Sequence, residues 1–319
     1  MIKKTKIYIF LVFSDIIILG EVKVMNKKRN LKIKWKNILI IILLVTIISF
    51  TIIKTISYIK ENPKEEKTDQ QIKYEKKLKK LDNIDEKIKY FNYNKIDRYI
   101  NYKENNNKLS LEEIITNVNI GLDQPHYENS TETTYLNKEY ILVNKYHHLS
   151  ENYIPKNLQT INTKYAKENM QLVSYAKDAF ERMAEDALKE NLHLIAMSTY
   201  RSYEYQKNLY NNYVKTDGKE KADTYSARPG HSEHQTALAV DFCTNDTNYE
   251  QFEETKEFKW MQKNAHKYGF ILRFPKDKTK ETGYQYESWH YRYVGKEIAT
   301  YIHENNISFE EYYVQFIEN

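Results

Sequence analysis

Two histidines, an aspartate and a glutamate in the second half of the chain could together hold and use a metal ion. His234 and Asp241 lie seven residues apart, and Glu287 lies three residues before His290. Two imidazoles and one carboxylate would leave a zinc ion an open fourth position for water, which is typical of a catalytic site. Glu287 need not bind the ion, so it is the candidate base for removing a proton from that water.

Spacing alone leaves structural roles open for these residues. An isolated histidine is more often a structural residue than a ligand, and Glu287 could be a solvated turn residue. His231 lies three residues before His234, and we expect it to line the cleft without binding metal. Arg292 follows His290 by two residues, so the two side chains share one face of a strand. We therefore expect Arg292 to orient a neighbouring carboxylate.

The elements around these residues predict an α+β fold. Apolar residues at helical spacing predict a helix over residues 166–191, and the apolar stretch at 192–197 reads as a buried strand. Helices and short strands are mixed without a βαβ rhythm, which favours α+β over α/β. The other expected elements are helices over 202–216, over 252–268 with Gly269 as its stop, and from 296 and 308, and strands over 270–274 and 289–294.

Composition limits the classes of function. The chain has 319 residues, with 49 Lys and Arg, 44 Asp and Glu, and a single cysteine. One cysteine excludes an intramolecular disulfide framework and a zinc site built from several thiolates. Residues 1–60 carry a net charge of +10, so the remainder carries −5. A mildly acidic body argues against a nucleic-acid partner, because phosphate binding needs a basic surface.

An apolar run near the N-terminus predicts a membrane anchor. Residues 38–53 contain no charged side chain and follow a basic cluster at 27–36. We therefore predict a transmembrane signal anchor over 37–59, with residues 1–36 cytoplasmic and the catalytic part extracytoplasmic. The weaker apolar run at 7–19 is either a poor extra segment or translated upstream sequence, in which case Met25 is the true start and residues 1–24 are mis-annotated.

The rest of the chain divides into three further parts. Residues 60–83 are highly charged and predict a partly helical stem. Residues 84–138 contain recurring Tyr, Ile and Leu, with a capping box formed by Ser110 and Glu113. We expect this N-terminal extension to pack at the edge of the folded domain. Residues 139–319 then form the catalytic domain.

Three segments of this domain closely resemble the VanY-type D-alanyl-D-alanine carboxypeptidases. They are STYRSYEYQ at 198–206, YSARPGHSEHQTALAVDF at 225–242 and ETGYQYESWHYRYVG at 281–295. These enzymes are zinc peptidases of the hedgehog/DD-peptidase fold, related to VanX dipeptidases and LdcB-type L,D-carboxypeptidases. The resemblance covers residues 139–317 and implies a small antiparallel sheet with flanking helices.

The resemblance also implies residue roles. His234, Asp241 and His290 would bind one Zn²⁺ per chain, and Glu287 would be the general base. Arg201 would bind substrate and help to stabilise the oxyanion, since a guanidinium offers forked donors. Ser232 and Gln206 are candidates for gripping the terminal D-residue. Two departures from the family, Ala237 and Thr199 where glycine is usual or frequent, leave the geometry of their loops open.

The implied function is hydrolysis of the terminal D-Ala-D-Ala bond of peptidoglycan stem peptides or lipid-linked precursors, outside a membrane to which the chain is anchored. Two alternatives stay open. One is an L,D-carboxypeptidase of the same fold that removes D-Ala from tetrapeptide stems. The other is a non-catalytic cell-wall-binding module that keeps the fold as a scaffold.

Overall fold

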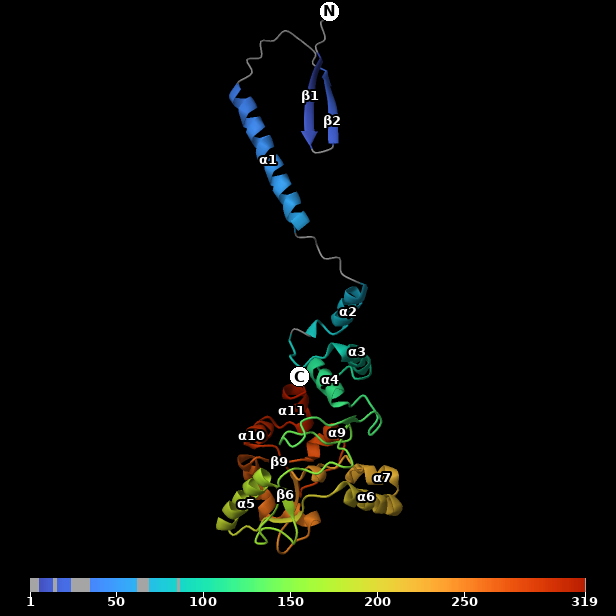
Figure 1. The fold of residues 1–319 in the computed structure, drawn as a ribbon, viewed down its shortest axis with the longest axis vertical. Coiled ribbons are helices and arrows are strands. Elements are labelled where there is room, and N and C mark those ends of the chain that lie inside the picture. The colour runs from blue at the N-terminus through green and yellow to red at the C-terminus, as the bar shows by residue number, and fades with distance from the viewer. Residues whose placement is uncertain (1–5, 14–15, 24–34, 62–68, 85–86, 319) are drawn as a thin grey trace, which may run out of the picture. The chain divides into compact units, whose positions relative to one another are not determined.

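The computed structural model describes residues 6–13, 16–23, 35–61, 69–84 and 87–318. The chain divides into two compact units, Met1–Thr68 and Asp69–Asn319 (Figure 1). The boundary lies inside the predicted stem. Residues 62–68, 85 and 86, which belong to the predicted stem and extension, are outside the described residues.

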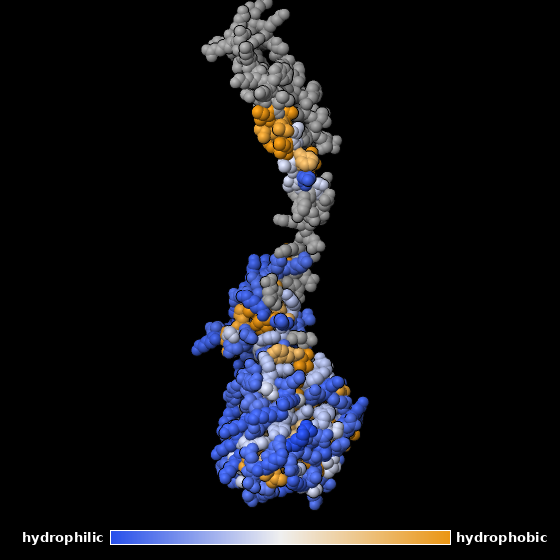
Figure 2. Space-filling model, turned by 90° about the vertical axis from the view of Figure 1, so that its left-hand side faces the viewer, coloured by the Kyte–Doolittle hydropathy of each residue, from blue (hydrophilic) through white to orange (hydrophobic). Residues whose placement is uncertain are grey.

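The first unit contains a hairpin and a long helix. Strands β1 (Lys6–Phe13) and β2 (Ile16–Lys23) pair antiparallel, and helix α1 spans Trp35–Glu61. The apolar run at 7–19 is thus divided between two strands. Large apolar side chains of α1 are exposed, among them Leu43 at 60% and Phe50 at 62%, and Figure 2 shows this surface in orange.

No helix in the part of the chain that the structure describes combines the length and the apolarity needed to cross a membrane. The transmembrane helix predicted over residues 37–59 is therefore not identified there.

The second unit has the mixed order of helices and strands that the sequence predicts. Its helices are α2 (Asp69–Lys80), α3 (Ile96–Asn105), α4 (Leu111–Ile120), α5 (Ser174–Lys189), α6 (Tyr203–Asp217), α7 (Lys219–Tyr225), α8 (Lys256–Asn264), α9 (Thr279–Thr282), α10 (Lys296–Asn305) and α11 (Phe309–Phe316). Its 3₁₀ turns are η2 (Tyr93–Lys95), η3 (Glu233–Thr236), η4 (Tyr249–Glu254), η5 (Ala265–Tyr268) and η6 (Lys276–Lys278).

A four-stranded antiparallel sheet forms the centre of this unit. Its strands are β7 (Ile195–Ser198), β8 (Ala239–Cys243), β10 (His290–Tyr293) and β9 (Phe270–Leu272), in that spatial order. Two small pairs lie outside it: β3 (Thr131–Glu132) runs parallel to β4 (His147–His148), and β5 (Leu158–Thr160) runs antiparallel to β6 (Gln171–Val173). The α+β class and the small antiparallel sheet are confirmed.

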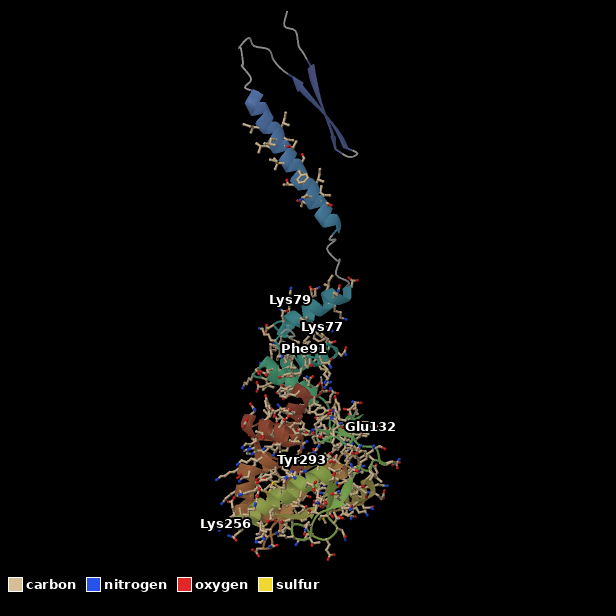
Figure 3. All side chains as sticks on the ribbon, turned by 60° about the vertical axis from the view of Figure 1, so that its left-hand side comes forward. Lys77, Lys79, Phe91, Glu132, Lys256 and Tyr293 are labelled. Carbon is tan, nitrogen blue, oxygen red and sulfur yellow. The ribbon has the colours of Figure 1, made fainter. Side chains whose placement is uncertain are left out.

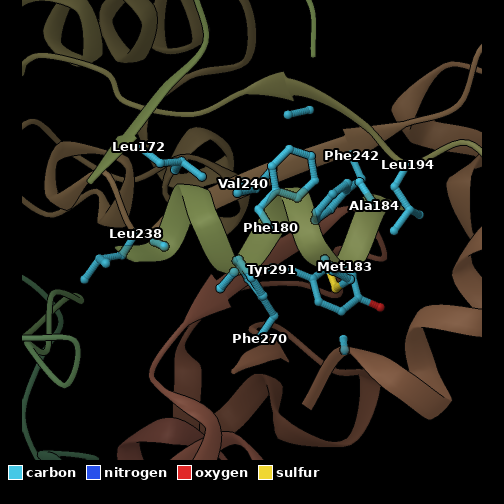
Figure 4. Packing of buried hydrophobic residues seen from close by; sticks show 14 of the residues in the cluster. Leu172, Phe180, Met183, Ala184, Leu194, Leu238, Val240, Phe242, Phe270 and Tyr291 are labelled. Atoms are coloured by element: carbon cyan, nitrogen blue, oxygen red, sulfur yellow. The ribbon is translucent and has the colours of Figure 1, made fainter. Parts of the chain in front are cut away.

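Helix α5 covers one face of the central sheet. Phe180 packs against Phe242 with ring centroids 5.6 Å apart, and Phe242 meets Tyr291 at 5.5 Å (Figure 4). Because side chains alternate along a strand, Val240 and Phe242 face this core while Asp241 between them points to the other side. The core thus fixes which face of the sheet carries the candidate ligands.

The structure corrects two predicted helices. The helix expected over 166–191 begins at Ser174, because Gln171–Val173 form β6. The helix expected over 252–268 is divided into η4, α8 and η5, since Thr255 is extended with ψ 162° and caps α8 with its hydroxyl. Gly269 ends η5 with φ 90°, as predicted. The helices over 203–217 and from 296 and 309 agree with expectation.

The N-terminal extension belongs to the same compact unit as the sheet. Helix α2 packs on α3, α3 on α4, and α4 on α11. Phe91, labelled in Figure 3, packs against Tyr99 with the ring centroids 5.1 Å apart and the rings tilted by 43°. The predicted capping box at Ser110 is confirmed, and a second capping box at Ser308 begins α11.

Candidate metal site

The register of three strands brings distant residues into one row. His290 on β10 pairs with Asp241 on β8, and Asp241 pairs on its other side with Ser198 at the end of β7. A bulge in β7 separates Ala196 from Ser198, which re-aims the chain before Arg201. The candidate ligands on the two strands are 49 residues apart in sequence, so the sheet brings them together.

His234 comes from the turn η3, which precedes β8. The turn ends at Ala237, which is buried and has φ 55° and ψ 31°. This is the left-handed conformation that glycine adopts most easily. The alanine therefore keeps the loop geometry of a glycine here, at a cost in backbone strain.

The three predicted ligands converge. One ligand atom from each of His234, Asp241 and His290 lies within 4.8 Å of the others, and all three residues are buried. His234 Nε2 lies 3.2 Å from Asp241 Oδ2, and His290 Nδ1 lies 2.9 Å from Asp241 Oδ1. Across the described residues, this is the one group of three or more His, Cys, Asp or Glu side chains arranged to hold an ion.

The donor set fits a divalent cation. His234 Nε2 is buried without a hydrogen-bond partner, while its Nδ1 lies 2.6 Å from the carbonyl oxygen of Thr199. The carbonyl can only accept, so Nδ1 carries the proton and Nε2 has a free lone pair. Two imidazole nitrogens and one carboxylate oxygen are ligands that zinc prefers. Threonine in place of the glycine that is frequent in the family does not disturb this contact, because Thr199 accepts through its main-chain carbonyl oxygen.

Burial and neighbouring charges set the ionisation of these groups. Burial lowers the pKa of His234 to about 4, so the ring is neutral at pH 7. Burial alone would lower the pKa of His290 too, but the hydrogen bond to Asp241 and the nearby carboxylate of Glu233 raise it to about 9. Burial opposes ionisation of Asp241, yet the two histidines hold its pKa well below the usual range. Without metal, Nδ1 of His290 holds a proton that an ion must displace.

Glu287 lies beside this group. Its Oε2 is 3.8 Å from His290 Nδ1, and its backbone N–H donates to Phe274 O in the turn that leads into β10. The side chain is buried, and burial raises its pKa to about 8, with His290 opposing the shift. A carboxyl group poised near neutrality can both accept and release a proton.

Arg201 reaches the site from the loop after β7. Its Nη2 donates to Asp241 Oδ2 at 3.0 Å, Nη1 to Gln206 Oε1 at 3.0 Å, and Nε to Ser198 Oγ at 3.1 Å. Gln206 in turn donates from Nε2 to Ala227 O at 2.8 Å. Both ends of the Gln206 amide therefore bond protein groups, and this side chain holds the guanidinium in place.

A cleft of about 930 Å³ opens over these side chains. Its walls include Ser232, which is buried, and His231, whose Nδ1 lies 2.7 Å from Asn144 O. His231 is not part of the ligand group, as expected. Tyr249 and Trp289 add an aromatic wall, with ring centroids 5.0 Å apart.

Sequence reasoning missed one buried acid at this site. Glu233 lies between Ser232 and His234, is 3% exposed, and has Oε2 3.6 Å from His290 Nε2. Its Oε1 accepts from Arg273 Nε at 2.8 Å and from Arg292 Nη1 at 2.7 Å. The sequence did contain a signal for this acid. Arg273 and Arg292 lie within apolar strand patterns, and a buried guanidinium needs a negatively charged partner.

Together these features define a protein with a single-metal site of two histidines and one aspartate, set in an open cleft of an α+β fold, with a buried carboxyl group beside it. The profile of the family described as VanY, D-alanyl-D-alanine carboxypeptidase, matches residues 169–296. The chain belongs to the VanY family.

Individual relatives agree with this assignment. A bifunctional D-Ala-D-Ala dipeptidase and carboxypeptidase, VanXYC from Enterococcus gallinarum, is 30% identical over 54% of this chain and 92% of its own. The putative carboxypeptidase YodJ from Bacillus subtilis is 43% identical over 54% of this chain and 66% of its own. The solved structure of the LdcB LD-carboxypeptidase has a TM-score of 0.53 and 38% identity, and covers 59% of this chain and 98% of that one. The chain spans 41% to 66% of the length of the first three curated relatives that it matches.

Proposed function

We propose that this protein is a zinc-dependent D-alanyl-D-alanine carboxypeptidase acting on peptidoglycan stem peptides or their precursors. The observation that carries the proposal is the convergence of His234, Asp241 and His290, with Glu287 Oε2 3.8 Å from His290 Nδ1. Membership of the VanY family supports the substrate class. A non-catalytic wall-binding role would need neither an open metal site nor a buried base beside it.

The residues divide the chemistry of peptide hydrolysis among themselves. A zinc ion in such a site supplies Lewis acidity, which polarises a carbonyl group and lowers the pKa of water to about 7. Glu287 accepts the proton of the attacking water on its carboxylate and returns it to the leaving amine. Arg201 lines the cleft and offers guanidinium donors to the substrate carboxylate or the developing oxyanion. Ser232, which also lines the cleft, is proposed to contact the terminal residue of the substrate.

The direct test combines metal analysis with product release. We expect purified full-length protein to contain one zinc ion per chain and to release D-Ala from a pentapeptide stem ending in D-Ala-D-Ala. The His234→Ala variant should contain no zinc and release no D-Ala. Zinc-free wild-type protein, or zinc-loaded protein that releases no D-Ala from any stem peptide, would contradict the proposal and favour a binding module.

A second specificity is favoured by one observation. The LdcB LD-carboxypeptidase resembles this chain over 98% of its length, with a TM-score of 0.53. An L,D-carboxypeptidase would use the same metal site to remove D-Ala from tetrapeptide stems. Defined tetra- and pentapeptides separate the two: mass analysis should show faster cleavage of the pentapeptide, and faster cleavage of the tetrapeptide would assign L,D specificity instead.

We further propose that residues 37–59 anchor the protein in the cell membrane, with the N-terminus cytoplasmic and the catalytic unit outside. Residues 38–53 lack charged side chains and follow a basic cluster, and the described apolar side chains of α1 are exposed. Exposed surface of this kind marks a membrane or protein contact. In intact cells, protease added outside should digest Asp69–Asn319 of membrane-bound protein. Protein found in the soluble fraction, or protected from protease, would rule the anchor out.

A further inference from the structure

Four charged side chains form a closed cluster beneath the metal site. Glu233, Arg273, Arg292 and Glu310 are each at most 3% exposed. Arg273 bridges the two acids, with Nε 2.8 Å from Glu233 Oε1 and Nη2 2.5 Å from Glu310 Oε1. Two positive and two negative charges balance, which a buried cluster requires.

The two arginines of the cluster bond only one of the two carboxylate oxygens of Glu233. Its Oε1 accepts from Arg273 Nε and from Arg292 Nη1, at 2.8 and 2.7 Å. Arg292 is itself tied to the main chain, since its Nη2 donates to the carbonyl oxygens of Glu139 and Ile141 at 2.9 and 2.7 Å. The other oxygen of the acid, Oε2, is buried and has no hydrogen-bond partner.

The free oxygen of Glu233 faces a second buried atom without a partner. His290 Nε2 is also buried and unbonded, and it lies 3.6 Å from Glu233 Oε2. That separation exceeds a normal hydrogen bond by about 0.5 Å. A buried acceptor and a buried donor that are each unpaired cost free energy, so closing this gap is favourable.

The two candidate ligand rings present opposite nitrogens to the site. His290 has Nδ1 2.9 Å from Asp241 Oδ1, whereas His234 has Nε2 3.2 Å from Asp241 Oδ2. The outer nitrogen of His234 faces a main-chain carbonyl at 2.6 Å. The outer nitrogen of His290 faces the carboxylate of Glu233.

We propose that Glu233 is the positioning residue of the metal site: it accepts the Nε2–H of His290 and so keeps Nδ1 free to bind the ion. A ligating histidine commonly donates its other N–H to a carboxylate, which fixes the tautomer and the ring orientation. The two arginines fix the carboxylate in turn. This inference rests on the proposed zinc site and adds a residue to it.

The tautomer can be measured in the wild-type protein, and substitutions serve only to assign the signals. In full-length, zinc-loaded protein with ¹⁵N-labelled histidine, we expect metal-bound Nδ1 and protonated Nε2 for His290, and the reverse for His234. Each histidine is assigned by its substitution to Gln. A zinc-loaded His290 bound through Nε2 would overturn the inference, because Glu233 would then have no proton to accept.

Matched substitutions separate positioning from folding. Glu233→Gln and Glu310→Gln each remove one charge from the same cluster, but only Glu233 faces His290. We expect Glu233→Gln to raise the zinc dissociation constant 10- to 100-fold in a chelator competition, and Glu310→Gln to change it less than 3-fold, although both lower the melting temperature. Equal zinc affinity in the two variants would refute the inference, and if neither folds, the wild-type tautomer decides.

The outcomes also distinguish this inference from the proposed function. Wild-type protein that binds no zinc defeats the proposed function itself. Wild-type protein that binds zinc, with Glu233→Gln binding it equally well, leaves the proposed function intact and removes only the role of Glu233.

Discussion

Asp241 contacts three other side chains of the site. One carboxylate oxygen faces His290 Nδ1, and the other faces both His234 Nε2 and Arg201 Nη2. A single residue therefore joins two candidate ligands to the residue proposed to hold the substrate. Because Arg201 already pairs with a ligand, changes to it should affect turnover through position as well as charge.

Glu287→Gln tests the proposed base. The amide keeps the shape of the side chain but cannot accept and return a proton, so we expect kcat for D-Ala release to fall by about 10²- to 10⁴-fold. Zinc content should be unchanged, because Glu287 is not one of the three ligands. The matched control is Glu281→Gln, a partly buried acid outside the cleft, which should keep activity within 2-fold. Full activity in Glu287→Gln would exclude the role.

Arg201→Lys tests the geometry of the guanidinium. One ammonium cannot bond Ser198, Gln206 and Asp241 as the three nitrogens of Arg201 do. We expect kcat/KM to fall at least about 10-fold, measured by D-Ala release with zinc loading checked. Arg182→Lys, on exposed α5 surface, is the control and should be unaffected. A lysine variant as active as wild type would show that only the charge matters.

At the scale of elements, the site depends on short turns rather than on long helices. The turn η3 supplies His234 and ends at Ala237, and the turn before β10 supplies Glu287. The left-handed backbone of Ala237 lets the chain pass directly from the turn into β8. Its methyl group packs in the main core. Replacing Ala237 by glycine would therefore relieve backbone strain but lose this packing.

Substitution of Ala237 should reveal that balance. Ala237→Gly removes about 1–2 kcal/mol of backbone strain, but loses about 0.8 kcal/mol of methyl burial and about 0.4–1 kcal/mol through a freer unfolded chain. We expect the free energy of unfolding in urea to change by less than about 1 kcal/mol. Ala237→Val should cost at least about 2 kcal/mol, because a β-branched residue is an outlier at positive φ. A glycine variant destabilised more than the valine variant would contradict the observed backbone.

Across the whole molecule, the candidate ion would join segments that are distant in sequence. The ligands come from η3, β8 and β10, and the supporting contacts come from the loop after β7 and from α11 through Glu310. An ion that binds only where these segments meet binds the folded state and not the unfolded chain. Folding and metal binding are then linked.

Removal of zinc should therefore lower thermal stability. At a free zinc concentration 100 times the dissociation constant, binding stabilises the fold by about 2.7 kcal/mol, which corresponds to about 5–10 °C in a domain of this size. We expect EDTA to lower the melting temperature by that amount and added zinc to restore it. The melting temperature of the His234→Ala variant should change with neither EDTA nor added zinc. An identical wild-type melting temperature with and without EDTA would argue against a zinc site.

The sequence by itself indicated the candidate ligands, the neighbouring acid, the α+β class and the capping box at Ser110. The residues of the site and of the cap lie in short stretches of chain: His234 with Asp241, Glu287 with His290, Ser110 with Glu113. Spacing within these stretches suggested a metal site, and their resemblance to the VanY-type enzymes implied the role of each residue. The exact start of α5 was missed, because Gln171–Val173 pair with the preceding strand β5 and this pairing overrides helical periodicity.

Only the tertiary structure decided which groups meet across those stretches. Glu233 and Arg292 are 59 residues apart, and Gln206 meets Ala227 O across 21. Such contacts depend on strand register and on the turn that aims each side chain, and a change of one residue in register moves a side chain to the opposite face. Which nitrogen of His290 faces the metal site follows from this packing, for the physical reason that ring orientation is set by neighbours on both sides and not by its own sequence.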